Sequence, residues 1–514
     1  MRKEDCGKKK EPSMSNSLRL SSLGGLILLL AAPLRAAALP PGATLPESGP
    51  AMATPVRIDI DAGTVLHTVD ERNFHGINFV ALWNDTGDSP GTVKAFSQMG
   101  MGLVRFPGGC PAEWYDWKEP LATGWTELTP ERAWAFAKAG GAKMVFQTNA
   151  ATDKTDKNKK TGDPYTLSSS AAHAADWVAD ARKKAISVAF WEIGNEPEMD
   201  APGQHKKTQE AVYAWYNAKF AEQVAAIKKI DPAAKAMGPA ACNTWFWWHE
   251  KNLEKFMKAH GNKEGSGLVD AVSLHWYLEG GSGSWEQKRG GAQGWEKCMD
   301  YIRGAIKQYD TRDLPLYITE WNWGAGDKCD GAKRMSNALG TADCIGMFLR
   351  TGVAGHQFFC LQKIGRGWGV LAMKQDCRPQ NEAAPTYYAL CLASKLGGKV
   401  LSVKNGADEA NVLSAYATRH ADGSLQVMLI NKSASPVAVT LGFTGYTCQG
   451  KRVQTWTLAG AKNSAADTDV VFNGMASPAP SQQELPKPQV ASAAAATVTH
   501  ELKPCSMAVL VFDP

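Results

Sequence analysis

The sequence predicts an α/β protein: a (β/α)8 TIM barrel followed by a C-terminal antiparallel β-sandwich domain. Its 514 residues exceed one average domain and suit a large barrel with a smaller module. Between residues 71 and 397, eight short apolar runs alternate with longer helical patterns, as in a closed parallel barrel. From residue 398 onward the helical patterns give way to short alternating runs, which are typical of a sandwich.

The N-terminal segment 1–38 has the pattern of a signal peptide. Basic residues precede the apolar run 23–32, and small residues follow at 36–38. Met14 is a second candidate for the true start, because the residues before it are unusually charged. The apolar run is short for a bilayer span, so no stable membrane insertion is expected after cleavage. We expect a secreted or periplasmic protein, with 39–53 as a linker; an uncleaved anchor is the alternative.

The charge distribution excludes a nucleic-acid partner. The formal net charge is +5, but residues 1–38 carry seven basic and three acidic side chains, so most of the excess lies in the predicted signal peptide. The remainder of the chain is nearly neutral and lacks the basic footprint of a nucleic-acid-binding surface.

The barrel is predicted over residues 71–397, and no Gly-x-Gly-x-x-Gly turn follows its first strand, as an open dinucleotide-binding sheet would require. Its strand candidates are 74–79, 102–109, 142–149, 186–196, 234–240, 271–277, 314–322 and 355–362. Helical patterns lie between them at 131–140, 170–184, 208–230, 296–309 and 333–350.

The sandwich is predicted over residues 398–514. Turn signals such as Asp422-Gly423 separate its short runs. Residues 54–70 alternate in the same way and are expected to add an N-terminal strand to this domain. The segment 476–497 is rich in Pro, Ala, Ser and Gln, which predicts a flexible loop.

Two glutamates carry the chemistry. Glu196 closes the fourth strand candidate and Glu320 closes the seventh. Active sites of barrels lie at the C-terminal ends of the strands, so both side chains are expected in one mouth. Glycoside cleavage needs one carboxylic acid to protonate the leaving oxygen and one carboxylate to attack the anomeric carbon. We therefore predict a retaining glycosidase with Glu196 as acid/base and Glu320 as nucleophile.

The motifs around these glutamates resemble glycoside hydrolase clan A, which has Asn-Glu-Pro on strand four and Glu on strand seven. Within the clan, Arg-Phe-Pro-Gly-Gly at 105–109 followed by Trp-Tyr-Asp-Trp at 114–117 is similar to family 51. His-Trp-Tyr at 275–277 and Gln362 resemble further positions of that family. The resemblance implies an α-L-arabinofuranosidase-like enzyme that acts on plant-type polysaccharide.

Two departures from family 51 leave the sugar open. The sugar-gripping glutamate after strand one is absent from 76–83, and Cys110 stands where the family has Asn. Families 39, 79 and 30 share the barrel-plus-sandwich plan, with xylose, glucuronic acid or glucose as the sugar. The alternatives are therefore an endo-β-1,4-glucanase or xylanase, another exo-glycosidase such as a β-xylosidase or β-glucuronidase, or a non-catalytic carbohydrate-binding barrel.

The remaining site residues are predicted to bind and orient the substrate. Asn195 can donate to the sugar 2-hydroxyl, Arg105 and Tyr277 can hold Glu320 ionised, and His275 can orient either glutamate. The other candidates are Gln362, Asn149 after strand three, and aromatic rings at the mouth, namely Trp83, Trp321 and the aromatic run 245–248.

No cofactor or metal is expected. A metal-dependent barrel hydrolase would need a cluster of ligands at the strand ends, and neither His-x-His on strand one nor Glu-x-x-His occurs. The expected partner is an oligo- or polysaccharide substrate. Export permits disulfides, and Cys329 with Cys377, or Cys448 with Cys505, are conceivable pairs.

Overall fold

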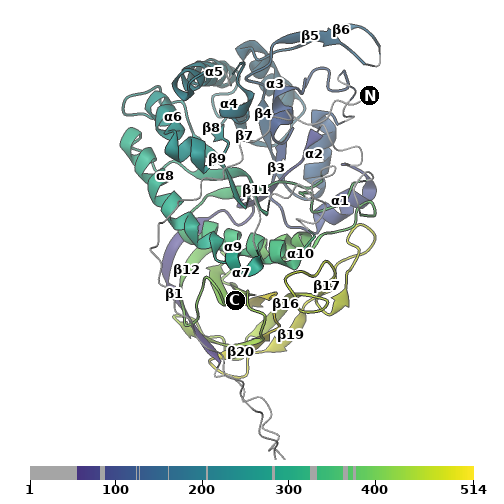
Figure 1. The fold of residues 1–514 in the computed structure, drawn as a ribbon, viewed down its shortest axis with the longest axis vertical. Helices are drawn as coiled ribbons and strands as arrows, with labels where there is room; N and C mark the ends of the chain where they lie inside the picture. Colours follow the sequence, from purple (N-terminus) through teal and green to yellow (C-terminus); the bar gives the residue numbers. More distant parts are fainter. Residues whose placement is uncertain are drawn as a thin grey trace, which may run out of the picture. The chain divides into compact units, whose positions relative to one another are not determined.

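The computed structural model describes residues 55–514 apart from 82–86, 123, 125, 127, 160, 204–206, 280–283, 325–332, 363–367 and 374–377 (Figure 1). The predicted signal peptide 1–38, the candidate start Met14 and the linker 39–53 lie outside the described residues. Within the described part of the chain, no helix is both long and apolar enough to cross a membrane.

The eight strand candidates form one closed parallel barrel, in the order β10-β11-β2-β3-β4-β7-β8-β9, so the predicted fold class is confirmed. In chain order the strands are β2 (His75–Asn78), β3 (Leu103–Phe106), β4 (Lys143–Thr148), β7 (Val188–Ile193), β8 (Ala236–Ala241), β9 (Ala271–Glu279), β10 (Leu316–Gly324) and β11 (Gly355–Phe358). Every residue of β2, β3 and β8 is buried, as expected for parallel strands that are covered on both faces.

Helices surround the barrel, and several begin at a Ser or Thr whose side chain accepts a backbone N–H of the first turn, as Thr129 and Thr208 do. The helices are α1 (Pro90–Ser97), α2 (Pro130–Ala139), α3 (Ala171–Lys183), α4 (Pro197–Asp200), α5 (Gln209–Ile230), α6 (Asn252–His260), α7 (Trp285–Lys288), α8 (Trp295–Tyr309), α9 (Met335–Thr351) and α10 (Pro385–Ala393). Short helical turns are η2 (Cys110–Glu113), η4 (Trp245–His249) and η5 (Gly291–Gly294), and β5 (Lys154–Lys157) pairs with β6 (Pro164–Leu167).

The barrel interior has an apolar layer near the start of its strands. Its members pack as one cluster: Leu103, Val145, Phe190, Met237, Ala271 and Tyr317. Because side chains alternate along a strand, the next inward positions lie two residues later. There the layer is polar, with Arg105, Gln147 and Glu192. Apolar side chains therefore fill the barrel near the start of its strands, and polar side chains fill it closer to their C-terminal ends.

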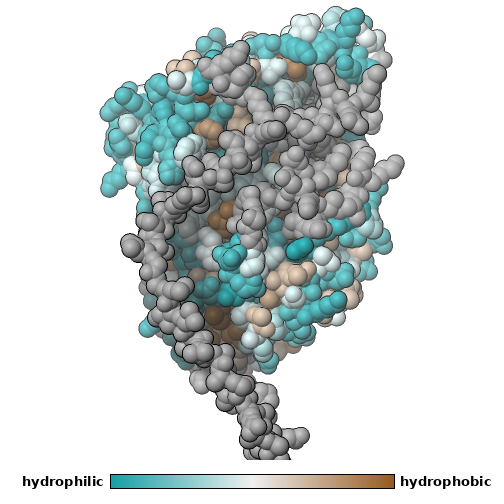
Figure 2. All heavy atoms as spheres, viewed as in Figure 1, coloured by the Kyte–Doolittle hydropathy of each residue, from teal (hydrophilic) through white to brown (hydrophobic). Residues whose placement is uncertain are grey.

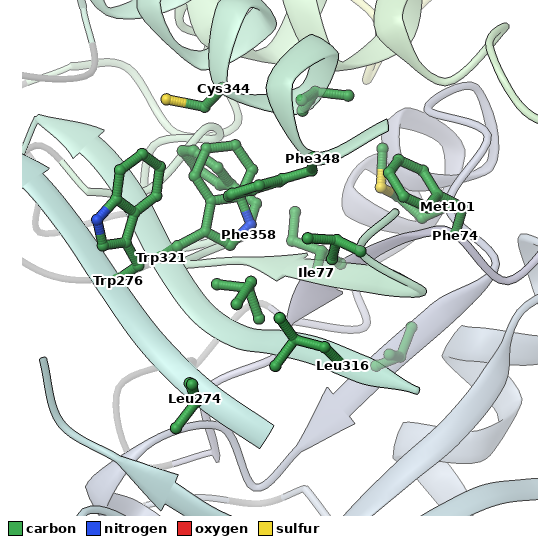
Figure 3. Packing of buried hydrophobic residues seen from close by; sticks show 14 of the residues in the cluster. Phe74, Ile77, Met101, Leu274, Trp276, Leu316, Trp321, Cys344, Phe348 and Phe358 are labelled. Carbon is green, nitrogen blue, oxygen red and sulfur yellow. The ribbon is translucent and has the colours of Figure 1, made fainter. Parts of the chain in front are cut away.

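The main core lies between the barrel strands and the surrounding helices. Figure 3 shows Trp276, Trp321 and Phe358 from the strands gathered beneath Phe348 of α9. The ring centroids of Trp321 and Phe348 are 5.0 Å apart, and the rings meet edge to face. On the face drawn in Figure 2 the described surface is mostly hydrophilic, as expected for a chain whose apolar side chains fill this core.

The second domain is an eleven-stranded sheet, to which residues 54–70 contribute strand β1. β1 pairs antiparallel with β12 and parallel with β15, so one pairing departs from the purely antiparallel expectation. Phe443 of β15 contacts Phe512 of β21 although these strands are not neighbours, so the sheet folds over its own core as two layers. The strands are β1 (Val56–Val69), β12 (Gly398–Asn405), β13 (Leu413–Arg419), β14 (Leu425–Asn431), β15 (Val437–Thr444), β16 (Arg452–Gly460), β17 (Val470–Phe472), β18 (Met475–Ala476), β19 (Gln489–Ser492), β20 (Val498–Leu502) and β21 (Ser506–Phe512).

The segment 476–497 differs from the predicted loop because part of it is paired. β19 forms an antiparallel ladder with β16. In addition, the side-chain amide of Gln98, which follows helix α1, forms hydrogen bonds to the backbone of the segment through both its nitrogen and its oxygen. Gln98 donates to the carbonyl of Pro480 at 2.9 Å and accepts from the backbone N–H of Leu485 at 2.7 Å. These backbone contacts are invisible to a composition argument.

A buried ion pair joins α9 to the sheet. Lys432 donates to Asp343 at 2.8 Å, and neither side chain is exposed. Tyr416 of β13 donates to the other carboxylate oxygen of Asp343 at 2.8 Å.

The suggested pairing of Cys448 with Cys505 is wrong, because both are free and donate to the carbonyls of Ala495 and Ser433. Cys329 and Cys377 lie outside the described residues.

Candidate active site

The two glutamates meet at the C-terminal mouth of the barrel. Glu196 follows the end of β7, and Glu320 lies on β10 beside His275 of β9. One ligand atom from each of Glu196, His275 and Glu320 lies within 4.8 Å of the others. A separation of about 5 Å between carboxyl groups is that of retaining glycosidases. Both side chains are mostly buried, at 16% and 9% exposure, yet they keep a face toward the mouth.

Glu320 is held by a donor on each of its oxygens. The hydroxyl of Tyr277 donates to Oε1 at 2.6 Å, and Nη1 of Arg105 donates to Oε2 at 3.1 Å. Hydrogen bonds from a charged donor to a carboxylate are stronger than those between neutral groups, and two donors fix the orientation of both oxygens. The arrangement therefore suits a nucleophile that must be negatively charged before substrate arrives.

Arg105 is the centre of the polar layer and has no exposed surface. Its Nε donates to Glu192 at 2.6 Å and its Nη1 to the side chain of Asn78 at 2.9 Å. Its Nη2 donates to Asn195 Oδ1 at 3.0 Å and lies 3.2 Å from His275 Nε2. Arg105 thus orients the groups around the carboxylates and does not itself reach the open mouth.

The contacts of His275 fix its tautomer. A guanidinium can only donate, so Nε2 of His275 must accept from Arg105, and the ring proton lies on Nδ1. Nδ1 then donates to Oε1 of Glu196 at 2.8 Å. Burial, together with the positive charge of Arg105, lowers the pKa of His275 to about 4. His275 is therefore a neutral donor that orients Glu196.

Sequence reasoning missed three residues of this layer. Glu192 and Asn78 bind Arg105 directly, and Gln147 accepts the backbone N–H groups of Gly108 and Gly109 at 2.9 and 3.1 Å. A signal was present, because each is a polar residue at a buried position of a barrel strand. Such a residue must find a buried partner.

Three of the predicted substrate-binding side chains form hydrogen bonds to other parts of the protein in this structure. Asn149 closes a local turn, accepting from Ala151 and Thr152 N–H and donating to the Thr152 carbonyl. Trp321 is fully buried and donates to His356 at 3.2 Å, because it follows the inward-facing Glu320 and points to the opposite face. Gln362 is also fully buried and donates to Ala372 and Asn381. Trp83 lies outside the described residues.

The aromatic run after β8 forms η4 and divides into two kinds of ring. Trp247 is buried and donates to the carbonyl of His275 at 3.1 Å, so it packs beneath the site. Trp245 is 49% exposed, and only three residues separate it from the buried end of β8. An exposed indole at a barrel mouth offers a flat apolar surface to a sugar ring.

Among the residues that the structure describes, Glu196, His275 and Glu320 form the one group placed to hold a metal ion. However, the guanidinium of Arg105 already contacts both His275 and Glu320. A fixed positive charge in that position disfavours a second cation. The site chemistry therefore favours acid/base and nucleophilic roles for the two carboxylates.

Comparison with known proteins supports the resemblance to glycoside hydrolase clan A. Residues 171–434 match the model of Glycosyl hydrolases family 39, and this stretch includes both glutamates. The chain is 26% identical over 270 residues to an intracellular exo-α-(1→5)-L-arabinofuranosidase of Streptomyces lividans, covering 46% of this chain and 38% of that protein. It is 21% identical over 313 residues to endoglucanase A of Paenibacillus lautus, covering 50% of this chain and 41% of that protein. The chain therefore spans about two fifths of the length of these curated relatives.

Solved structures share the fold. The family 51 α-L-arabinofuranosidase of Thermotoga petrophila superposes with a TM-score of 0.65 at 16% identity, over 89% of this chain and 99% of that one. A bifunctional glucanase–xylanase from a metagenome library gives a TM-score of 0.63 at 16% identity, again over 89% and 99%. The resemblance to clan A, with a fold like that of family 51, is thereby confirmed, whereas the matching family model is that of family 39.

Proposed function

The chain belongs to the glycosyl hydrolases of family 39, and from this membership we propose that it is a retaining glycosidase with Glu196 as acid/base and Glu320 as nucleophile. One observation carries the proposal: the two carboxylates share one mouth, and their ligand atoms lie within 4.8 Å of each other and of His275. That spacing leaves no room for a water molecule between the nucleophile and the sugar.

In the first step a carboxylate oxygen of Glu320 attacks the anomeric carbon, and the bond to the leaving oxygen breaks as that oxygen takes the proton of Glu196. In the second step a water oxygen attacks the same carbon, its proton passes to Glu196, and Glu320 is released. Because His275 donates to Oε1 of Glu196, the transferred proton is carried by the other oxygen, Oε2.

For the substrate, we propose plant-type polysaccharide and an α-L-arabinofuranosidase-like specificity. The motifs at 105–109 and 275–277 and an arabinofuranosidase among the relatives support this choice. Endo-acting β-glucanase or xylanase activity is the second candidate, since Cys110 departs from family 51 and Trp245 is exposed at the mouth. A β-xylosidase is a third, because family 39 includes enzymes whose sugar is xylose.

Product analysis separates these candidates. The enzyme is incubated with arabinoxylan, xylan and β-glucan, and the products are resolved by chromatography. Free arabinose from arabinoxylan supports the first choice, and free xylose supports a β-xylosidase. Release of long oligosaccharides alone, with neither pentose, would overturn both and leave the endo-acting enzyme.

The mechanism is tested by the anomer that is released first. NMR of the reaction should show retention, and Glu320→Ala should abolish turnover because no other nucleophile is available. Azide should partly restore Glu320→Ala by attack from the vacated side, with inversion. In Glu196→Ala, azide should instead react with the glycosyl-enzyme and give the retained product. An inverted first product from the wild-type enzyme would disprove the assignment of Glu320.

We also propose that the protein is exported and that its mature chain begins after residues 36–38. The proposal rests on the order of basic, apolar and small residues in that segment. N-terminal sequencing of protein from the extracellular or periplasmic fraction tests it. A chain in that fraction that still begins at Met1 or Met14 would contradict cleavage.

A further inference from the structure

We propose that Glu113 is a positioning residue for Glu196: its buried carboxylate fixes the backbone beside the acid/base. This inference rests on the proposed role of Glu196. Glu113 ends η2, directly after the Pro-Gly-Gly turn that follows β3. It is 1% exposed, so it does not touch substrate and acts only through its neighbours.

The Glu113 carboxylate joins loops that follow three successive barrel strands. Its Oε1 accepts the backbone N–H of Asn195 at 2.9 Å, after β7. Its Oε2 accepts the N–H groups of Ala150 and Ala151 at 2.8 and 2.7 Å, after β4. Three backbone donors on one side chain tie the η2 turn and these two loops together at the level of the active site.

The backbone of Glu196 needs such support. Its φ is 36°, a left-handed conformation that is unfavourable for a residue with a side chain. The preceding Gly194 also has a positive φ, and a Cβ there would lie 3.0 Å from Oε1 of Glu113. On either side of Asn195, the backbone N–H groups bond to carbonyls of Thr148 and Ala240. The N–H of Asn195 itself is held by the Glu113 carboxylate, so Glu113 fixes the residue next to the acid/base.

The surroundings of the Glu113 carboxylate indicate a positioning role, because a buried carboxylate without a cationic partner does not in itself stabilise the fold. The ion pairs found among the described residues give Glu113 no cationic partner, and burying an unpaired charge is costly. Burial raises the pKa of Glu113 to about 7, although the three N–H donors favour the ionised form. Only the carboxylate can accept on both oxygens. An amide in its place would present N–H to the N–H of Asn195.

The experiment compares aryl glycosides with good and poor leaving groups. Protonation by Glu196 matters little for a dinitrophenyl leaving group and greatly for a phenyl one. Glu113→Gln should therefore lower kcat/KM for the phenyl glycoside about tenfold more than for the dinitrophenyl glycoside, a fraction of the roughly 100-fold or larger effect of general acid catalysis. Equal losses on both substrates would overturn the proposal, because they would indicate a merely structural residue.

Matched variants make the result specific. Asp310→Asn alters another buried carboxylate that accepts backbone N–H groups, those of Asn262 and Arg312, at the opposite end of the barrel before β10. It should lower stability without any leaving-group dependence. Glu196→Ala should show the full dependence; if it does not, the proposed role of Glu196 fails, independently of Glu113.

A second variant covers the case in which Glu113→Gln does not fold. Glu113→Asp keeps the charge but shortens the side chain, so it should fold and show a smaller selective loss on the phenyl glycoside. Thermal unfolding of each variant separates loss of folded protein from loss of positioning. Wild-type behaviour of Glu113→Asp on both substrates, or an equal loss on both, would overturn the proposal.

Discussion

Arg105 and Glu192 form an ion pair of 2.6 Å in which neither side chain has any exposed surface. The same guanidinium donates to Glu320 at 3.1 Å, so one buried cation lies between two carboxylates of different function. Glu192 holds the guanidinium in the barrel axis, and the guanidinium in turn holds the proposed nucleophile. The pair therefore links the stability of the barrel to the chemistry at its mouth.

Removing one partner of this pair should be costly. Arg105→Met leaves Glu192 buried and uncompensated, and we expect the free energy of unfolding to fall by about 3–5 kcal/mol. The double variant Arg105→Met/Glu192→Leu should recover part of that loss, because Glu192 no longer remains buried and unpaired, whereas Glu320 still lacks its charged donor. Urea denaturation of the single and double variants measures both. A double variant as unstable as the single one would contradict this account.

Tyr277→Phe removes the 2.6 Å hydrogen bond to Oε1 of Glu320. A hydrogen bond to a charged group contributes about 1.5–3 kcal/mol, so kcat/KM should fall roughly 10- to 100-fold even with an activated leaving group. Tyr446→Phe serves as the control, since its hydroxyl donates to the carbonyl of Asp513 in the sheet domain. Steady-state kinetics on a dinitrophenyl glycoside provide the measurement. Equal activities of the two variants would count against a role for Tyr277.

Acid should destabilise the protein through its buried histidines. Burial lowers the pKa of His75 to about 4 and that of His356 well below its usual value. Trp321 donates to His356, which donates to His75, which donates to the Leu396 carbonyl, so both rings are neutral. The unfolded chain has histidines with a pKa of about 6.5, so it takes up protons that the buried rings do not. The contribution of these rings to the free energy of unfolding is therefore fully present above about pH 6.5 and is lost as the pH falls toward about 4.

Urea denaturation across that window tests the prediction. The free energy of unfolding of the wild type should decrease as the pH falls from about 6.5 to about 4, by about 1.4 kcal/mol for each unit of pKa difference. A His75→Gln variant lacks one of these titrations, so its pH dependence should be weaker. A variant whose stability falls with pH as steeply as that of the wild type would show that His75 does not contribute.

Trp245→Ala should show whether the mouth of the barrel binds polysaccharide at sugars beyond the one that is cleaved. The ring is 49% exposed, so its loss should cost little stability. If it stacks on a sugar beyond the cleaved bond, KM for polysaccharide should rise severalfold, up to about tenfold for a contact of 0.5–1.5 kcal/mol. Kinetics on a small aryl glycoside should stay unchanged. Val490→Ala, another exposed apolar truncation, is the control for the sheet surface.

The barrel, the second domain and the place of the two glutamates at the strand ends follow from the sequence pattern alone. Apolar runs alternating with helical patterns can be satisfied by few folds, and the C-terminal ends of parallel strands share one edge. Glu196 and Glu320 are therefore expected together although 124 positions separate them, and the fold brings both within reach of His275.

Which neighbouring side chains face the mouth depends instead on packing between distant parts of the chain. Trp321 follows Glu320 directly but is buried, because one step along a strand reverses the side-chain direction and a register shift follows Ile318. Gln362 lies beyond the end of β11 and is buried in the loop contacts with Ala372 and Asn381. Glu113 and Glu192 showed no motif, since their partners come from other strands and are brought close only when the barrel closes. Local pattern fixes where a strand ends, whereas long-range closure fixes which buried charges meet.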